Sequence, residues 1–280
     1  MKTPDQYTVI GNPIKHSKSP MIHQAFARQT NQDITYTRTL GHTEHFAKDV
    51  RTFIAAGGKG LNVTVPFKQQ AFDLADSLST QAEAAGAVNT LSVQPDGSLF
   101  GDNTDGIGLV QDLQRNHGIP LANKHILLIG AGGAARGVLQ PILDCHPASL
   151  WIANRNPDKA HALATLARTP NVSGCGLHDV PKQPFDLLIN ATAASLHGQV
   201  PAIPLSTIGP QSQAYDMLYS QEPTAFMRWA TEQGAVTVMD GFGMLVEQAA
   251  AAFYQWRGIR PDTTSVFQLF NRADNSALLS

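Results

Sequence analysis

The sequence predicts an α/β protein of two domains, and three observations carry this prediction. The chain has 280 residues, which is long for one domain and ordinary for two. Predicted strands and helices alternate along most of it, a pattern typical of largely parallel sheets. In the second half, a glycine-rich turn lies between a predicted strand and a predicted helix, as in Rossmann-type folds. We expect a first domain over 1–105, joined by C-terminal helices over 244–280, a Rossmann-type domain over 106–243, and a cleft between them.

The first domain is expected to build a mostly parallel sheet. β-Branched runs predict strands at 7–11, 35–40 and 61–65, and amphipathic patterns predict helices at 21–30, 45–56, 69–76 and 80–85. The glycines at 57–60 are expected to stop a helix before the third strand. The segments 87–93 and 99–101 flank a Pro95-Asp96-Gly97 turn, which predicts a hairpin at the edge of the sheet.

A helix over 106–117 is expected to lead into the second domain. Strands are predicted at 125–130, 150–153, 186–190, 214–218 and 236–239, with helices or loops between them as in a doubly wound fold. An Ala-rich amphipathic helix over 244–256 is expected to return to the first domain. Because the chain would then cross between domains near Gly106 and Asp240, we hypothesise that the domains open and close about these places.

The composition excludes several kinds of partner. The formal net charge is -2 with no block of like charges, so no nucleic-acid or anionic-membrane surface is expected. No apolar run approaches the length of a membrane span, and residues 1–6 lack a signal-peptide pattern, so we expect a cytoplasmic protein. Cys145 and Cys175 have no disulfide-framework or metal-ligand spacing. We expect a small-molecule partner, no metal, and a monomer or homodimer.

The glycine-rich turn has the form Gly-x-Gly-x-x-Ala, and it indicates a dinucleotide site. Gly130 permits the tight turn, Gly132 lets the backbone approach a pyrophosphate, and Ala135 allows close packing of helix and strand. Free amides at the start of the helix attract phosphate. The candidate cofactor-binding residues of this turn are Gly130, Ala131, Gly132, Gly133 and Ala134.

The end of the next predicted strand favours NADP over NAD. An acidic residue there would hold the 2′-hydroxyl of NAD, whereas this chain has Asn154-Arg155. The guanidinium of Arg155 can grip the extra phosphate of NADP or stack on adenine, and Lys159, one turn on, adds a second positive charge. A solvated arginine without a ligand is the alternative.

Several motifs spread over the chain resemble those of the NADP-dependent shikimate dehydrogenase family. They are Gly11-Asn12-Pro13-Ile14-Lys15-His16-Ser17-Lys18-Ser19-Pro20, Asn62-Val63-Thr64-Val65-Pro66-Phe67-Lys68, Ala85-Gly86-Ala87-Val88-Asn89-Thr90, Gly101-Asp102-Asn103-Thr104-Asp105-Gly106, and the segment from Asp240-Gly241 to Gln248. The resemblance implies a reversible, NADPH-dependent reduction of 3-dehydroshikimate to shikimate in aromatic amino-acid biosynthesis.

The residue types support a substrate site for a hydroxylated ring acid. Ser17 and Ser19, two apart in a segment predicted to be extended, can aim both hydroxyls at a carboxylate near a helix start, although Ser19 also suits an ordinary helix cap. Asn62 and Thr64 are expected to share one face of a strand and, with Asn89, to hydrogen-bond ring hydroxyls. Alternating polar residues on a half-exposed strand are the plainer interpretation.

Lys68 and Asp105 are the predicted catalytic pair. Reducing a ketone requires a proton donor at its oxygen, and a lysine can donate that proton while a neighbouring carboxylate orients it and keeps it charged. Taken alone, Lys68 would be better explained as a solvated lysine and Asp105 as a helix-capping aspartate. The family resemblance instead favours a catalytic role for both.

The resemblance implies the remaining site residues. Tyr219 and Gln248 would complete the substrate pocket, and Thr192, Met217 and Gly241 would contact the cofactor. The chain departs from the family pattern at Asn156, in the 190–195 segment and in the 219–224 segment, which leaves the loop geometry near the cofactor open.

Three other functions compete with this one. A quinate-preferring or dual-specificity dehydrogenase would accept one more hydroxyl and could use NAD. A non-catalytic NADP-binding sensor would keep the glycine loop without turnover, and intact Lys68 and Asp105 argue against it. A scaffolding protein would leave the polar residues at strand ends unexplained.

Overall fold

The structure is a computed structural model, and it describes residues 3–277. It divides into two compact units, which we call unit 1 and unit 2. Unit 1 consists of the chain up to Gly108 together with the chain from Leu245 onward, and unit 2 is Leu109–Met244.

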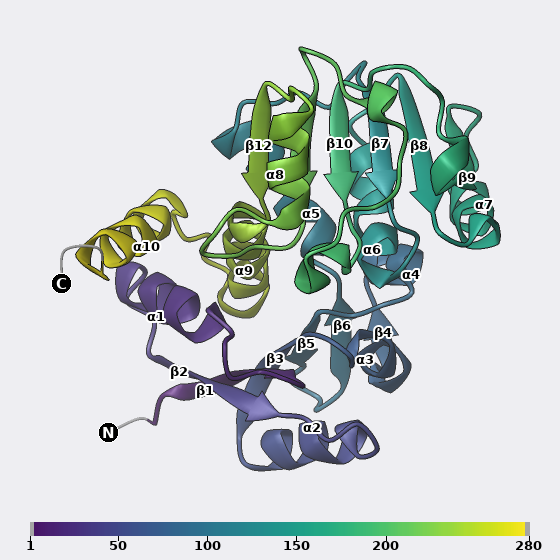
Figure 1. Cartoon of the computed structure of the whole chain (residues 1–280). Coiled ribbons are helices and arrows are strands. Elements are labelled where there is room, and N and C mark those ends of the chain that lie inside the picture. Colours follow the sequence, from purple (N-terminus) through teal and green to yellow (C-terminus); the bar gives the residue numbers. More distant parts are fainter. Residues whose placement is uncertain (1–2, 278–280) are drawn as a thin grey trace. The chain divides into compact units, whose positions relative to one another are not determined.

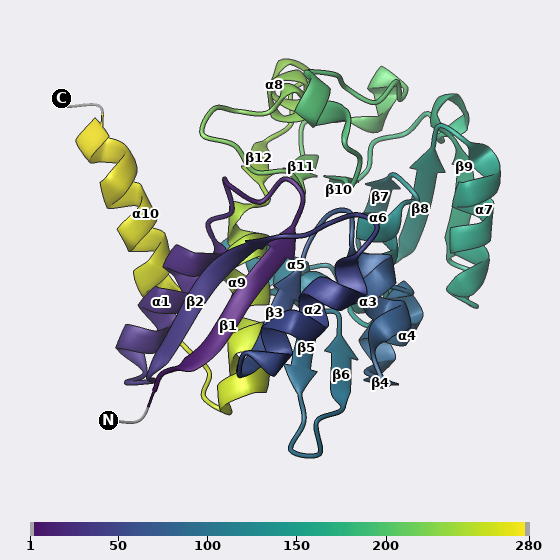
Figure 2. The ribbon, with the colours of Figure 1, turned by 90° about the horizontal axis from the view of Figure 1, so that it is seen from below.

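Unit 1 is a mixed sheet with helices packed on it (Figures 1 and 2). Its strands are β1 (Asp5–Gly11), β2 (Ile34–Leu40), β3 (Gly58–Val63), β4 (Ser77–Leu78), β5 (Thr90–Val93) and β6 (Leu99–Asp102). Its helices are α1 (Ser19–Gln29), α2 (Phe46–Ala55), α3 (Lys68–Leu74), α4 (Thr80–Ala85), most of α9 (Phe242–Arg257), α10 (Thr264–Ala277) and the start of α5 (Asp105–Gln111). The strand order is β2-β1-β3-β5-β6-β4, and β1, β2 and β3 are parallel.

The β5–β6 hairpin does not form the edge of this sheet, so that prediction is wrong. The two-residue strand β4 lies parallel to β6 on its outer side. The backbone N–H groups of Asp76 and Ser79 donate to the carbonyls of Leu99 and Gly101, each at 2.9 Å. A strand of two residues is too short to show the alternation by which strands are recognised.

Strand β3 begins inside the glycine segment that was expected to separate it from a helix. A Cβ on Gly58 would lie 2.3 Å from the Phe53 ring, and one on Gly60 would lie 2.5 Å from Nε1 of Trp256. Gly58 and Gly60 are therefore strand residues against which aromatic side chains pack. The strand ends at Val63, so Thr64 lies just beyond it, and its N–H donates to the Ile10 carbonyl at 2.9 Å.

Helix α10 returns to unit 1 and lies beside α1 (Figure 2). The side-chain amide of Gln29 on α1 donates to the Asp262 carbonyl and to the Ser265 hydroxyl, both at 3.0 Å. These contacts tie the chain after α9 to the helix that follows β1.

Unit 2 is a doubly wound parallel sheet, as the sequence predicts. Its strands are β7 (His125–Ile129), β8 (Ser149–Asn154), β9 (Val172–Gly176), β10 (Leu187–Asn190), β11 (Gln213–Asp216) and β12 (Thr237–Asp240), and its helices include α6 (Gly133–Leu143), α7 (Pro157–Leu166) and α8 (Ala225–Glu232). The order β12-β11-β10-β7-β8-β9 is that of a Rossmann fold, with the change of winding direction between β7 and β10. The sequence did not predict β9, whose Val-Ser-Gly-Cys-Gly composition is poor in strand-forming residues.

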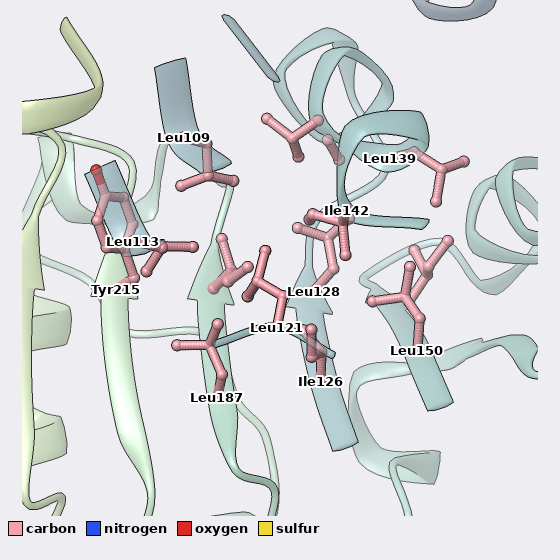
Figure 3. Close-up of a cluster of buried hydrophobic side chains, with 14 of the residues drawn as sticks. Leu109, Leu113, Leu121, Ile126, Leu128, Leu139, Ile142, Leu150, Leu187 and Tyr215 are labelled. Atoms are coloured by element: carbon pink, nitrogen blue, oxygen red, sulfur yellow. The ribbon is translucent and has the colours of Figure 1, made fainter. Parts of the chain in front are cut away.

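The core of unit 2 explains why β7 is apolar at every position from Ile126. Ile126 and Leu128 belong to the cluster under α6 and α7, shown in Figure 3, while Leu127 and Ile129 belong to the cluster that includes α8. Successive strand residues face opposite sides, so a sheet covered on both faces needs a continuous apolar strand. None of the helices between residues 3 and 277 is long and apolar enough to cross a bilayer.

Candidate active site

Lys68 and Asp105 form an ion pair in unit 1. Each is the first residue of a helix, α3 and α5 respectively. Nζ of Lys68 lies 2.5 Å from Oδ2 of Asp105, and the two side chains are 28% and 11% exposed. The carboxylate is thus largely removed from water while a small molecule can reach the ammonium. An ammonium has three protons, so Lys68 can donate to a bound oxygen and keep its bond to Asp105.

Asn89 holds the other oxygen of the Asp105 carboxylate. Its Nδ2 donates to Oδ1 of Asp105 at 2.8 Å and to Oγ1 of Thr104 at 3.0 Å, and its Oδ1 accepts from the Thr104 N–H at 2.9 Å. Oε1 of Gln248, on α9, accepts from Asn89 Nδ2 and from Thr104 Oγ1 at 3.4 Å each. The structure therefore brings Asn89, Asp105, Lys68 and Gln248 into one polar cluster.

Asn62 joins this cluster through its side-chain amide. Nδ2 donates to the Asn89 carbonyl at 3.3 Å and to Oγ1 of Thr90 at 3.1 Å, while Oδ1 accepts from the Tyr36 hydroxyl at 2.7 Å. Thr90 in turn donates to Oδ1 of Asn89 at 2.8 Å. The predicted site residues do not include Tyr36, Thr90 or Thr104, because side-chain partners that are distant in the chain leave no local signal in the sequence.

Ser17 and Ser19 lie together, but not in the extended segment that was predicted. Ser17 N–H donates to the Ile14 carbonyl at 3.1 Å, which makes a turn, and Lys18 has helical angles at the N-cap of α1. The helix-cap interpretation of Ser19 is therefore also wrong, since Ser19 is already the first residue of α1. Ser17 Oγ donates to Ser19 Oγ at 3.2 Å, and the Arg38 guanidinium donates to the Ser17 carbonyl through Nε at 2.9 Å.

The glycine turn of unit 2 leaves open space beside its backbone. Gly130 has a φ of +114°, and a Cβ there would lie 3.2 Å from the Ala191 carbonyl, so only glycine fits without strain. A Cβ on Gly132 or Gly133 would meet nothing within 4 Å. The amides of the first turn of α6 have no acceptor inside the helix. This exposed, backbone-lined cradle fits a pyrophosphate.

The residues after β8 are arranged around the start of α7. The Asn156 side chain caps this helix by accepting from the Asp158 N–H at 2.9 Å, and Nδ2 of Asn154 donates to the Asn156 carbonyl at 2.9 Å. At Asn156, where the chain departs from the family pattern, the side chain is thus a favourable N-cap. Arg155 and Lys159 are exposed on the same turn.

Asp216, which is not among the predicted site residues, organises the loops that follow β10 and β11. This fully buried carboxylate accepts from Ser195 Oγ at 2.7 Å, from Thr224 Oγ1 at 2.6 Å and from Asn190 Nδ2 at 3.1 Å. Oδ1 of Asn190 then accepts from Thr192 Oγ1 at 2.7 Å. These bonds define the 190–195 and 219–224 segments whose geometry the sequence left open.

Met217 and Gly241 lie against each other after β11 and β12. A Cβ on Gly241 would lie only 2.2 Å from the Met217 carbonyl oxygen, and the Gly241 N–H donates to the Leu218 carbonyl at 3.1 Å. Tyr219, also in unit 2, packs edge-on against Phe242 with ring centroids 6.3 Å apart. Burial, and then the charge of Asp240, raises the pKa of the Tyr219 phenol.

The candidate cofactor residues of unit 2 therefore follow the carboxyl ends of five parallel strands of one sheet, β7, β8, β10, β11 and β12. The arrowheads of β7, β8, β10 and β12 point the same way in Figure 1. This is the edge at which doubly wound sheets bind nucleotides. Within the described chain, no group of three or more His, Cys, Asp or Glu side chains is placed to hold a metal ion. The fold and the site together define a class of α/β protein. One unit has a sheet of the kind that binds dinucleotides, and the other has a polar cluster around a lysine–aspartate ion pair.

Comparison with known proteins identifies the family within this class. Family profiles match at residues 9–91 (shikimate dehydrogenase substrate binding domain), 112–198 (shikimate/quinate 5-dehydrogenase) and 241–266 (shikimate 5'-dehydrogenase C-terminal domain). The NADP(+) shikimate dehydrogenase of Halorhodospira halophila is 53% identical over 264 residues, covering 94% of this chain and 97% of the relative. The chain belongs to the shikimate dehydrogenase family.

Two solved structures illustrate the range of this fold. Shikimate 5-dehydrogenase of Thermus thermophilus, in complex with NADP(H) and shikimate, is 32% identical with a TM-score of 0.84, covering 96% of this chain and 99% of that one. The 5-ketofructose reductase of Gluconobacter, in ligand-free form, is 26% identical with a TM-score of 0.84, covering 98% of this chain and 100% of that one. The fold alone therefore does not fix the substrate.

Proposed function

We propose that this protein is an NADP-dependent oxidoreductase that catalyses the reversible reduction of 3-dehydroshikimate to shikimate, a step in aromatic amino-acid biosynthesis. The observation that carries the proposal is the Lys68–Asp105 ion pair at 2.5 Å, set in a cluster of amides and hydroxyls suited to a polyol ring. The high sequence identity to shikimate dehydrogenases over nearly the whole chain supports shikimate as the substrate, rather than the substrates of other proteins that share this fold.

Unit 1 is the proposed substrate domain, and different polar side chains of its cluster bind different groups of the substrate. The proposed substrate-binding residues are Ser17, Ser19, Asn62, Thr64, Asn89 and Gln248, with Tyr219 of unit 2. The paired hydroxyls of Ser17 and Ser19 suit the carboxylate, because hydroxyls donate to anions without bringing a second charge. Asn62 donates both amide hydrogens within the protein, so it binds the substrate through the second lone pair of Oδ1.

Unit 2 is the proposed NADP-binding domain. The cradle of Gly130, Ala131, Gly132, Gly133 and Ala134 would hold the pyrophosphate, and Asn154, Arg155 and Lys159 would hold the adenosine end with its 2′-phosphate. Thr192, Met217 and Gly241 would lie near the nicotinamide. The exposed guanidinium of Arg155 at the end of β8, where an NAD-specific sheet carries a carboxylate, supports NADP as the cofactor.

When bound, NADPH supplies the hydride that reaches the carbonyl carbon of the substrate. Lys68 donates a proton from Nζ to the carbonyl oxygen as negative charge develops there, which yields the alcohol. Asp105 orients Nζ through Oδ2 and stabilises the ammonium, and Asn89 fixes Asp105 through Oδ1. In the oxidation direction, neutral Lys68 accepts the proton of the alcohol. No metal takes part in this scheme.

The proposal is tested by following the absorbance of reduced nicotinamide when purified protein is mixed with shikimate or quinate and with NADP or NAD. Reduction of NADP by shikimate, faster than any other pairing, is the expected result. Turnover only with quinate or NAD would overturn the specificity. Binding of NADP without turnover of either acid would instead identify a sensor.

The proposed partners are small molecules only, with no nucleic acid, and the protein is proposed to be cytoplasmic and monomeric or homodimeric. The formal net charge of -2 supports the absence of a nucleic-acid surface. Sedimentation analysis measures the oligomeric state directly.

A further inference from the structure

The hydroxyl of Tyr36 connects two parts of the proposed substrate site in unit 1. Tyr36 lies on β2 and is 2% exposed. Its hydroxyl donates to Oδ1 of Asn62 at 2.7 Å, and the side chain of Ser19 lies beside the same phenol. Burial raises the pKa of the Tyr36 phenol well above its usual value, so the phenol remains a proton donor at any working pH.

Tyr36 is one of three groups that fix which way the Asn62 amide faces. An asparagine side chain can rotate by half a turn and exchange its oxygen and nitrogen, and the surrounding hydrogen bonds decide between the two orientations. On one side, the Asn89 carbonyl and Thr90 Oγ1 accept from Nδ2 at 3.3 and 3.1 Å. On the other side, the phenol donates to Oδ1. Without that donor, Oδ1 loses the 2.7 Å hydrogen bond that the phenol supplies.

His23 packs against the ring of Tyr36. The two rings stack at a centroid distance of 4.2 Å and an interplanar angle of 6°, and His23 is 0% exposed. Neither ring nitrogen of His23 has a hydrogen-bond partner among the described residues. Trp256 of α9 lies 5.4 Å from the imidazole centroid. The imidazole therefore acts on Tyr36 through packing rather than through a hydrogen bond.

These contacts place Tyr36 in a continuous path of polar side chains. The path runs from Ser17 and Ser19 through Tyr36, Asn62, Thr90, Asn89 and Asp105 to Lys68. Tyr36 is the link between the serine pair at the start of α1 and the amides at the ends of β3 and β5.

We propose that Tyr36 is a positioning residue for the substrate, which fixes the acceptor face of Asn62 toward the ring hydroxyls and is itself held by stacking on His23. The inference rests on the proposed function, since it assigns Asn62 to substrate binding. It deepens that function by naming a residue that acts without touching the substrate.

The test is the variant Tyr36→Phe, with Tyr7→Phe as the matched control. Tyr7 lies directly across from Tyr36 on β1, is 3% exposed and stacks on Trp256. Its hydroxyl accepts from Nη1 of Arg257 at 3.3 Å, so Tyr7→Phe removes a buried phenol hydroxyl outside the polar path. A cooperative thermal unfolding transition is the check that each variant folds.

Tyr36→Phe is expected to raise KM for shikimate about tenfold, the effect of losing one well-placed hydrogen bond, with a smaller change in kcat and an unchanged Kd for NADP. Tyr7→Phe is expected to leave KM unchanged. In an Asn62→Ala background, Tyr36→Phe should raise KM by no more than about twofold further, since the phenol acts through Asn62.

Three outcomes overturn the inference while wild-type turnover of shikimate still supports the proposed function. These are an unchanged KM in Tyr36→Phe, an equal rise in KM in Tyr7→Phe, and a full tenfold rise that persists after Asn62→Ala. A wild-type protein that neither oxidises nor binds shikimate overturns the function and the inference together.

Discussion

Buried His23 is expected to make unit 1 sensitive to acid. Burial lowers the pKa of its imidazole from 6.5 to about 3. Between these two pH values the imidazole is protonated in the unfolded chain and neutral in the folded chain. The free energy of unfolding therefore falls as the pH is lowered through this range. Above the range both states carry a neutral imidazole, and no stability is lost through this residue. Lowering the pH from about 7 to about 5 should therefore cost about 2 kcal/mol of stability through this one residue.

The surroundings of His23 support this assignment. The rings packed against it are Tyr36 from β2, Phe26 from its own helix, and Phe253 and Trp256 from α9. Among these four only Tyr36 titrates, and burial keeps its phenol neutral. None of these rings offers the imidazolium a counter-charge.

The variant His23→Leu removes the titrating group and keeps a side chain of similar volume. Urea-dependent hydrogen exchange, measured by mass spectrometry on peptides from β1, α1 and β2, gives the free energy of unfolding of unit 1, and peptides from unit 2 serve as an internal reference. The loss of stability between the two pH values should be about 2 kcal/mol smaller in His23→Leu than in the wild type. His161→Gln, an exposed histidine of α7, is the control variant. An equal loss in wild type and His23→Leu would refute the reasoning.

Further predictions concern the proposed cofactor residues. Arg155→Ala should raise the Kd for NADP about tenfold or more and leave that for NAD nearly unchanged, as measured by calorimetry, because one charge-assisted contact to the 2′-phosphate is lost; a parallel rise for NAD would place Arg155 elsewhere. Gly241→Ala and Gly174→Ala should each destabilise unit 2 by about 3 kcal/mol in thermal unfolding, since the new Cβ would lie 2.2 Å from the Met217 carbonyl oxygen and 2.5 Å from the Ala160 carbonyl. Of the two, only Gly241→Ala should weaken NADP binding several-fold, and equal NADP affinity in both variants would contradict the role of Gly241.

Those parts of the fold that depend on local sequence pattern could be predicted. The strand β7, the Gly130–Ala134 turn and the start of α6 follow one another within a few residues, so apolar run, glycine turn and helix are visible together. Strands β4 and β9 could not be predicted, because one has two residues and the other has a glycine-rich composition. The glycines of β3 indicated a helix stop, and only the rings lying over them explain why they belong to a strand.

The candidate site was accessible from the sequence only where a motif carried it. Lys68 and Asp105 are 37 residues apart, and their ion pair confirms that the two side chains meet, while their catalytic role stays a prediction. Tyr36 and Asp216 have no such motif. Each acts on partners brought together by the register of neighbouring strands, so their importance is visible only after the sheets are assembled. The Ser17 carbonyl likewise accepts from a partner distant in the sequence, the Arg38 guanidinium of β2.

The role of Lys68 as the proton donor is tested most directly by the steady-state kinetics of Lys68→Ala with shikimate and NADP. Lys59→Ala, an exposed lysine of β3, is the control. We predict that kcat of Lys68→Ala falls about a hundredfold to ten-thousandfold, with KM and the Kd for NADP changed far less, while Lys59→Ala behaves as the wild type. A Lys68→Ala variant that keeps the wild-type kcat would contradict the account.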